Sequence, residues 1–349
     1  MEWDILFPLA EEHGVCGLLA ARLEHLDDET LPKDWREKLQ SRMRAQHLFT
    51  LSMTAELPRI LDFFSKSNVE TLLVKGPIIS LLAYGDAALR GYVDLDLLVR
   101  HDDILAATQQ MLDLGFAPEF PLAGVHAGKI PGEYLFRRPG TQRIIELHTE
   151  RSFRYYPLPL PLQEFFARQR RVVLDGKEVP VLSLEDEFVL NCIHGAKHFW
   201  ERLMWVADIA AIVARHPEFD WHRTKRFAAN VGAMRMLHLA LQLSESLLGV
   251  NVPTAVAADV AADAPTRKLS LQVARWLPQA GLARPGLWER AAFRISMRGG
   301  GIAGAAYLLR LSLSPTDEDW QKDGGDGRSW LWDTLRRPLR LIRKYGPGS

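Results

Sequence analysis

The chain has 349 residues, of which 47% are hydrophobic and 25% charged, as is usual for a globular protein. This length suits one large domain, or two to three domains of about 100–200 residues each. The 43 basic and 43 acidic side chains give a formal net charge of zero, which excludes a global basic field for nucleic acid, so a polyanion would need a local patch.

Cysteine usage and the N-terminal sequence favour a cytoplasmic protein. Cys16 and Cys192 are far apart in apolar surroundings, so we expect buried thiols with neither a disulfide framework nor zinc-ligand spacing. The first 14 residues lack a basic region ahead of an apolar stretch and do not resemble a signal peptide. No run of about 18 apolar residues occurs, so we expect no membrane insertion.

Residues 1–67 are predicted to form an N-terminal helical segment. Apolar residues at helical spacing predict short helices at Trp3–Glu12 and from Cys16 onward. A further pattern opens at Pro32 and keeps apolar residues three and four positions apart as far as Ser67. That spacing predicts one long helix whose apolar face packs in a bundle.

The hydrophobic period changes at residue 68, and residues 68–150 are predicted to form a small α/β core with a mixed sheet. The order of elements is β-α-β-α-β-β, with a glycine turn between the first strand and the first helix. The predicted elements are a strand at Thr71–Val74, a helix at Ile78–Tyr84 preceded by Pro77, a strand at Tyr92–Val99, a helix at Ile104–Leu114 capped by Asp102 or Asp103, and a hairpin of Glu133–Arg138 with Gln142–Thr149.

The rest of the chain is predicted to be mainly helical. Residues 151–182 form an irregular linker with a small hairpin over Asp175-Gly176, and residues 183–349 form a C-terminal helical domain. Predicted helices begin at Ser183, run from Arg202 to His216, and run from Trp221 to Gly249. A basic stretch near the C-terminus, RRPLRLIRKYG (residues 336–346), could contact anionic lipid or dock on its own protein.

Three acids form the first candidate site. Asp94 and Asp96 are two positions apart in a predicted strand, so their side chains should share one face. Glu146, on a later strand of the same unit, supplies a third carboxylate. Carboxylates are costly to bury unpaired, and Mg²⁺ prefers oxygen ligands. The pattern is therefore consistent with two structures, a metal-dependent phosphate site and an edge strand with surface acids.

A candidate phosphate-binding turn precedes these acids. Lys75-Gly76 separates a strand from a helix N-terminus, where backbone amides attract anions, although a plain strand-to-helix turn has the same outline. Neither GxxxxGK[ST] nor GxGxxG is present. Arg90, four residues before Asp94, could contact a polyphosphate or pair with Asp86.

A second constellation lies on the helix that begins at Ser183 and just beyond it. His194 and His198 are four residues apart on one helix face, but the HExxH zinc pattern is absent. With Lys197 and Arg202, they either line a helical cleft as packed side chains or form a basic face that holds the nucleotide. Two further residues are acceptor-side or supporting candidates, His148 and Asp208.

Together, these motifs resemble those of a known family. A glycine turn, a helix, an Asp-x-Asp strand and a single later acid make up the arrangement of the nucleotidyltransferase superfamily related to DNA polymerase β. More narrowly, LLVKGPIISLLAYGDAALRGYVDLDLLV (residues 72–99) resembles the uncharacterised bacterial nucleotidyltransferase family NTP_transf_5. The resemblance continues at residues 144–150 and 183–213, and loosely at 336–346. The superfamily's usual Gly-Gly or Gly-Ser is replaced by Lys75-Gly76-Pro77.

This resemblance implies a mixed α/β fold in which a nucleotidyltransferase core lies between N-terminal helices and a C-terminal helical domain. It implies Mg²⁺ or Mn²⁺ bound by Asp94 and Asp96, with Glu146 as the third carboxylate, which orients or deprotonates the acceptor. Lys75, Gly76 and Arg90 would face the phosphates. A hydroxyl or phosphate acceptor would attack the α-phosphate of a nucleoside triphosphate (NTP), and pyrophosphate would leave.

Two alternatives accompany this reading: a non-catalytic nucleotide-binding protein of the same fold, and a toxin-like nucleotidyltransferase that modifies RNA or protein. The intact trio of carboxylates argues against the non-catalytic alternative. The zero net charge and the lack of an aromatic-basic RNA motif favour a small-molecule or peptide acceptor over nucleic acid.

Overall fold

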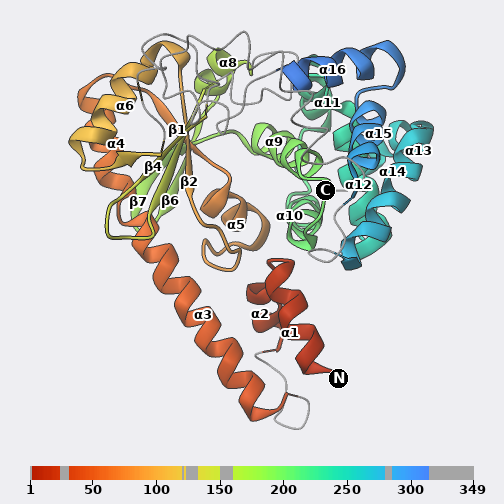
Figure 1. The fold of residues 1–349 in the computed structure, drawn as a ribbon, viewed down its shortest axis with the longest axis horizontal. Helices are drawn as coiled ribbons and strands as arrows, with labels where there is room; N and C mark the ends of the chain where they lie inside the picture. Colours follow the sequence, from red (N-terminus) through yellow and green to blue (C-terminus); the bar gives the residue numbers. More distant parts are fainter. Residues whose placement is uncertain are drawn as a thin grey trace.

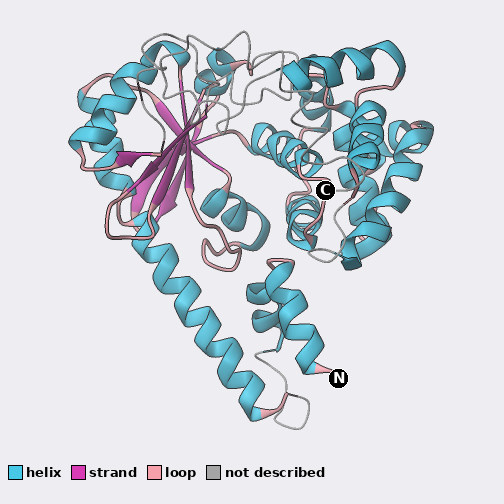
Figure 2. Ribbon diagram, viewed as in Figure 1, coloured by secondary structure: helices cyan, strands magenta, loops and turns pink. Residues whose placement is uncertain are grey.

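The computed structural model describes residues 2–23, 31–119, 122, 133–149, 160–279 and 285–313. It confirms the predicted fold class, a mixed α/β protein in which helices flank a mixed β-sheet (Figures 1 and 2). The basic stretch at residues 336–346 lies outside the described residues. Among the described residues, every helix is too short or too polar to cross a membrane. Both cysteines are buried and free, as predicted.

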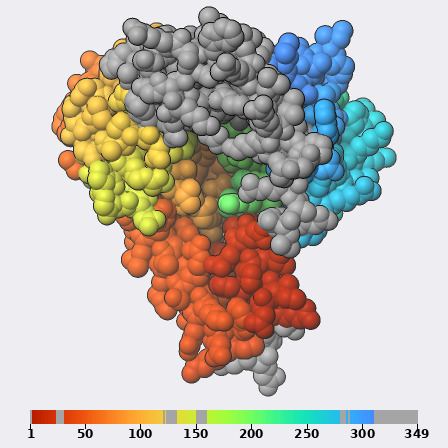
Figure 3. Space-filling view, in the orientation of Figure 1, coloured from red at the N-terminus to blue at the C-terminus, as the bar shows by residue number. Residues whose placement is uncertain are grey.

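The N-terminal helices are α1 (Trp3–Glu12), α2 (Cys16–Leu23), α3 (Lys33–Thr54) and α4 (Leu57–Lys66). The first three extend as a unit below the sheet in Figures 1 and 3, whereas α4 lies against the sheet, where Ile60 and Phe64 join the main core. The single helix predicted from Pro32 to Ser67 was wrong, because α3 ends at Thr54 and α4 begins at Leu57. Pro58 lies in the first turn of α4. Proline is tolerated there because the nitrogens of the first turn have no acceptor within the helix, so the missing N–H costs no hydrogen bond.

Close backbone contact fastens this N-terminal unit to the rest of the molecule. A Cβ built on Gly17 of α2 would lie 2.0 Å from the carbonyl oxygen of Leu89, so only glycine fits there. The Nδ1 atom of His13 accepts a hydrogen bond from the amide of Leu203, 3.2 Å away. The N-terminal helices therefore contact the loop that contains Arg90 and the start of a C-terminal helix.

The described strands form one seven-stranded sheet in the order β3-β4-β5-β2-β1-β7-β6. Their bounds are β1 (Thr71–Val74), β2 (Leu95–Val99), β3 (Ala117–Pro118), β4 (Glu133–Arg137), β5 (Ile144–His148), β6 (Arg170–Leu174) and β7 (Lys177–Val181). Strand β2 runs antiparallel to β1 and parallel to β5. Both predicted hairpins, β4–β5 and β6–β7, are present. The second hairpin joins the same sheet, because β7 pairs with β1 at Leu73 and Val181.

Strand β2 begins later than predicted, at Leu95 instead of Tyr92. The last residue of β1, Val74, pairs with Asp96, and the chain then turns away at Lys75. The backbone before Leu95 consequently has no partner on β1, and Asp94 lies in a bend ahead of the strand.

The register of the central strands places the polar residues on one face of the sheet. Asp96 and Glu146 are paired residues of β2 and β5, and His148 follows two positions later. Alternate residues such as Leu97 and Leu147 are fully buried on the opposite face. Helices α4 and α6 (Ile104–Asp113) lie on one side of the sheet, and α5 (Gly76–Tyr84) lies on the other (Figure 1).

The remaining helices follow β5 in the chain. They are α8 (Leu162–Ala167), α9 (Leu184–Lys197), α10 (Leu203–Arg215), α11 (Trp221–Asn230), α12 (Met234–Leu248), α13 (Thr254–Ala262), α14 (Ala264–Trp276), α15 (Leu287–Met297) and α16 (Gly301–Leu313). Of these, α10 packs against α5. Ser183 caps α9 as predicted. The single helix predicted from Trp221 to Gly249 was wrong: Gly232 has a φ of +68°, which ends α11 before α12 begins. Asp103 precedes α6 but makes no side-chain capping bond.

Candidate functional site

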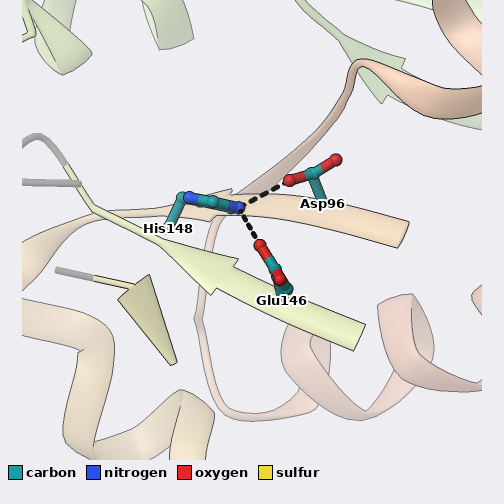
Figure 4. Close-up of side chains that lie close together, drawn as sticks. All are labelled: Asp96, Glu146 and His148. Carbon is teal, nitrogen blue, oxygen red and sulfur yellow. Dashed lines mark hydrogen bonds and ion pairs between the residues drawn. The ribbon is translucent and has the colours of Figure 1, made fainter. Parts of the chain in front are cut away.

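Asp96, Glu146 and His148 form a compact group on the polar face of the sheet (Figure 4). Each offers a potential metal-ligand atom, and these atoms all lie within 4.8 Å of one another. The Nε2 atom of His148 lies 2.6 Å from Oδ1 of Asp96 and 3.2 Å from Oε2 of Glu146. Two adjacent strands thus bring together side chains that are 50 residues apart in the sequence.

Lys75 approaches the same carboxylate from the turn between β1 and α5. Its Nζ atom donates to Oδ1 of Asp96 across 2.7 Å. Its backbone has φ 54° and ψ −143°, a conformation that costs a non-glycine residue about 1–3 kcal/mol. Its amide donates to Oε1 of Glu187 on α9, 2.7 Å away. That amide is therefore already used, and the predicted phosphate-binding turn would rely on the Lys75 side chain and on Gly76, which begins α5.

The cations set the charge state of this group. Burial opposes ionisation of Asp96, but Lys75 and His148 outweigh it and hold the pKa of Asp96 far below its usual range. Burial and Lys75 act to lower the pKa of His148, yet its hydrogen bonds to Asp96 and Glu146 raise that pKa to about 9. At neutral pH, Asp96 is therefore ionised and in contact with two cationic side chains.

Asp94 lies beside this group but outside its tight cluster of ligand atoms. Burial, followed by the charges of Asp96 and Glu146, raises the pKa of Asp94 to about 7. Both causes disfavour the ionised form of a carboxyl group.

The donor set fits a divalent cation. Carboxylates are the hard oxygen ligands that suit Mg²⁺ or Mn²⁺. The pKa of Asp94 is raised first by burial and then by the negative charges of Asp96 and Glu146, and a cation bound there would offset both effects. His148 and Lys75 compete with such a cation for Oδ1 of Asp96. A divalent cation would therefore have to displace these two side chains from Asp96.

Arg90 does not pair with Asp86, which was one predicted alternative. Its Nε atom donates to Oδ2 of Asp208 on α10, 2.7 Å away, and both side chains are buried. Tyr84 donates to the other oxygen of Asp208 across 2.9 Å. Burial raises the pKa of Asp208 even though Arg90 and Tyr84 favour its ionised form. This network joins the loop before Asp94 to the C-terminal helices.

The two histidines of the second constellation lie together, with ring centroids 4.7 Å apart and Trp205 beside them. Burial, and then Lys197 and Lys75, lower the pKa of His198 to about 3, and burial likewise holds the pKa of His194 well below its usual value. Both imidazoles are neutral at physiological pH. The predicted basic face thus reduces to Lys197, which donates to Glu133 of β4 across 3.5 Å, and the exposed Arg202.

Sequence reasoning missed Glu187. It lies on α9 and is fully buried, and its carboxylate contacts the Lys75 turn from 112 positions away in the chain. An acid in the first turn of a helix is common because the helix dipole favours it there. Its neighbours in that turn, Glu185 and Asp186, are also acidic, so the sequence offered no signal that distinguishes Glu187.

The comparison with protein families agrees with the resemblance seen in the sequence. The model of the NTP_transf_5 family, described as an uncharacterised nucleotidyltransferase, matches residues 1–249. The chain matches none of the curated proteins. The solved structures that it resembles include an antigenic nucleotidyltransferase-like protein from Paracoccidioides brasiliensis. The two share 17% identity over 61% of this chain and 96% of that one, with a TM-score of 0.34.

Proposed function

Because the chain belongs to the NTP_transf_5 family of uncharacterised nucleotidyltransferases, we propose that it transfers a nucleoside monophosphate from an NTP to a hydroxyl or phosphate acceptor with the help of Mg²⁺ or Mn²⁺. The observation that carries this proposal is the pairing of Asp96 with Glu146 across adjacent strands, with Asp94 beside them. Two paired acids on one sheet face, with a third acid in the bend before β2, suit the chemistry of phosphoryl and nucleotidyl transfer.

In this proposal Asp94, Asp96 and Glu146 hold the metal ion. When bound, the ion neutralises the phosphates and the charge that develops as pyrophosphate leaves. Glu146 also orients the acceptor or takes its proton, and its contact with His148 holds its carboxylate in place. Lys75 exchanges its contact with Asp96 for a contact with the triphosphate, since both partners are anionic and the ammonium is a mobile point charge.

The C-terminal helices complete the proposed site. Lys197 and Arg202 supply positive charge near the nucleotide, while the neutral His194 and His198 supply imidazole surfaces beside Trp205. Arg90 uses one edge of its guanidinium for Asp208, which therefore supports Arg90 and does not itself bind substrate. The nucleobase stacks against the rings of His194, His198 or Trp205 in this proposal.

We propose that the chain is divided into four parts. Residues 1–67 form the helical support, 68–150 the catalytic core, 151–182 the linker with its hairpin, and 183–349 the helical domain. A small-molecule or peptide acceptor fits a chain without net charge better than nucleic acid does. The two buried free thiols suit the reducing cytoplasm.

The test is direct. Purified protein is incubated with ATP, GTP, CTP or UTP and Mg²⁺ or Mn²⁺, and calorimetry measures binding while pyrophosphate release measures turnover in the presence of cell extract. A labelled triphosphate then shows which size class of acceptor is modified. Asp94→Asn with Asp96→Asn should abolish pyrophosphate release. The control, Asp102→Asn, changes an exposed acid near β2 and should leave it unchanged. Metal-independent binding, or turnover by the double variant, contradicts the proposal.

A further inference from the structure

We infer that Glu187 of α9 is a positioning residue for the proposed nucleotidyltransferase site: it holds the Lys75–Gly76 turn by its backbone and thereby aims the Lys75 ammonium at Asp96. The inference rests on the proposed function for its effect on catalysis. It identifies the residue through which a C-terminal helix acts on the catalytic core, and its structural part can be tested without any enzymatic activity.

The geometry makes Lys75 a bridge that is held at both ends. Its amide donates to Oε1 of Glu187 and its Nζ to Oδ1 of Asp96, each across 2.7 Å. Its carbonyl accepts from Ile78 across 2.8 Å, as expected at the start of a helix. Glu187 is fully buried, and its second oxygen has no hydrogen-bond partner. The carboxylate is therefore committed to the turn.

The turn needs this support because of its backbone conformation. Lys75 has a φ of +54°, where L side chains are rare, and the surrounding structure must impose such a conformation. A short hydrogen bond to a fully buried carboxyl group is a constraint of this kind, because a buried amide left without its partner is costly. Without Glu187, the Lys75 amide would lose its partner and the turn would relax. The Lys75 side chain would then no longer be held where its ammonium reaches Asp96.

The neighbouring acid provides a matched control. Asp186 is as buried as Glu187 and precedes it directly on α9, but its carboxylate is oriented differently. It accepts both bonds of a forked contact from Arg168, at 2.6 and 2.9 Å, and a further bond from Ser183. Asp186→Asn therefore disturbs the same helix and a similarly buried carboxylate without touching the Lys75 turn.

The first measurement is hydrogen–deuterium exchange of the peptide that spans residues 71–84, in the wild type, Glu187→Ala, Glu187→Gln and Asp186→Asn. Glu187→Ala should speed exchange within this peptide about ten- to hundredfold at the affected amide, the range expected when a buried donor loses its partner. Glu187→Gln keeps an oxygen acceptor and should stay near wild type. Asp186→Asn should leave this peptide unchanged even if it lowers the melting temperature.

The second measurement is the affinity for Mn²⁺ without nucleotide, and it separates positioning from general damage. A released Lys75 no longer competes for Asp96, so Glu187→Ala should bind Mn²⁺ more tightly while its KM for NTP rises more than its kcat falls. A loosened site would bind the ion more weakly. In a double-mutant cycle, Glu187→Ala should add nothing to Lys75→Met, because both act through one ammonium.

The outcomes distinguish the positioning role of Glu187 from the proposed nucleotidyltransferase function. Unchanged exchange in Glu187→Ala, or equal exchange in Asp186→Asn, overturns the positioning role of Glu187. Weaker Mn²⁺ binding by Glu187→Ala, or full additivity with Lys75→Met, overturns it as well. Faster exchange and tighter Mn²⁺ binding in a protein that never releases pyrophosphate would support the positioning role and refute the proposed function.

Discussion

The Nζ atom of Lys75 lies 2.7 Å from Oδ1 of Asp96, so a carboxylate proposed to bind a metal ion already contacts a protein cation. His148 contacts the same oxygen from the other side at 2.6 Å. Any divalent ion that binds Asp96 must compete with both. The strength of metal binding is therefore set by the balance between these cations and the three carboxylates.

Lys75→Met removes one of the two competitors and should raise the affinity for Mn²⁺ about tenfold in the absence of nucleotide, since a unit charge at this distance has a large effect in a buried site. The same change should weaken NTP binding. Isothermal titration of Mn²⁺ and of each NTP measures both effects. Lys225→Met, which removes an exposed lysine paired with Asp259, is the control and should change neither. Weaker Mn²⁺ binding by Lys75→Met would show that Lys75 supports the metal site.

Metal binding should strengthen as pH rises from 6 to 8. The pKa of Asp94 is raised to about 7 and that of His148 to about 9, so the folded protein holds protons that a metal ion must displace. For Asp94, the stability due to the bound proton is complete below the unfolded pKa of about 3.8 and is lost as pH passes 7. For His148 it is complete below about 6.5 and is lost through pH 9.

Thermal unfolding with and without Mn²⁺ tests this linkage. The increase in melting temperature caused by Mn²⁺ should be larger at pH 8 than at pH 6. Asp94→Asn removes one of the two protons and should flatten the dependence between pH 6 and 7. An increase that is the same at every pH would mean that neither proton is released when the ion binds.

The contact between Arg90 and Asp208 should be important for stability. Asp208→Ala leaves Arg90 buried without its partner, which costs about 3–5 kcal/mol in the free energy of unfolding. Asp259→Ala removes an exposed partner of Lys225 and should leave the free energy of unfolding nearly unchanged. Urea unfolding followed by circular dichroism compares the two. Equal small losses would indicate that water reaches Arg90 and solvates it.

Gly17 should not tolerate a side chain. Its Cβ would lie 2.0 Å from the carbonyl oxygen of Leu89, so Gly17→Ala must move α2 away from the loop that contains Arg90. Overpacking of this kind costs about 1–3 kcal/mol. Gly286→Ala is the control, because its nearest neighbour, Oε2 of Glu289, is 3.9 Å from the added atom. A melting temperature that falls for Gly17→Ala alone confirms the contact, and equal values for both variants contradict it.

Local sequence patterns predicted most of the elements and failed where backbone geometry or distant partners decide. Apolar spacing predicted β1, β2 and the two hairpins. It did not predict the helix breaks before Pro58 and at Gly232, because the apolar spacing continues on both sides of each break. The start of β2 depends on where β1 ends. That pairing joins strands 20 residues apart and leaves no local trace.

The site shows the same limit. Alternation placed Glu146 and His148 on one face, and the register of β5 against β2 brings them to Asp96. The charge states could not be foreseen, because they arise from burial and from contacts across the fold. His194 and His198 counted as basic by residue type, yet burial keeps them neutral. Glu187 and Asp208 act through partners more than 100 residues away.

The parallel pairing of β1 with β7 has a consequence for synthesis on the ribosome. Strand β1 is made early, but the neighbour on its second edge ends at Val181, and Glu187 follows only after that. Until then, the nascent chain presents an unpaired edge of apolar strand, which is prone to aggregation. Non-local closure of this kind slows folding. The Lys75–Gly76 turn therefore gains its Glu187 partner only when more than half of the chain has been translated.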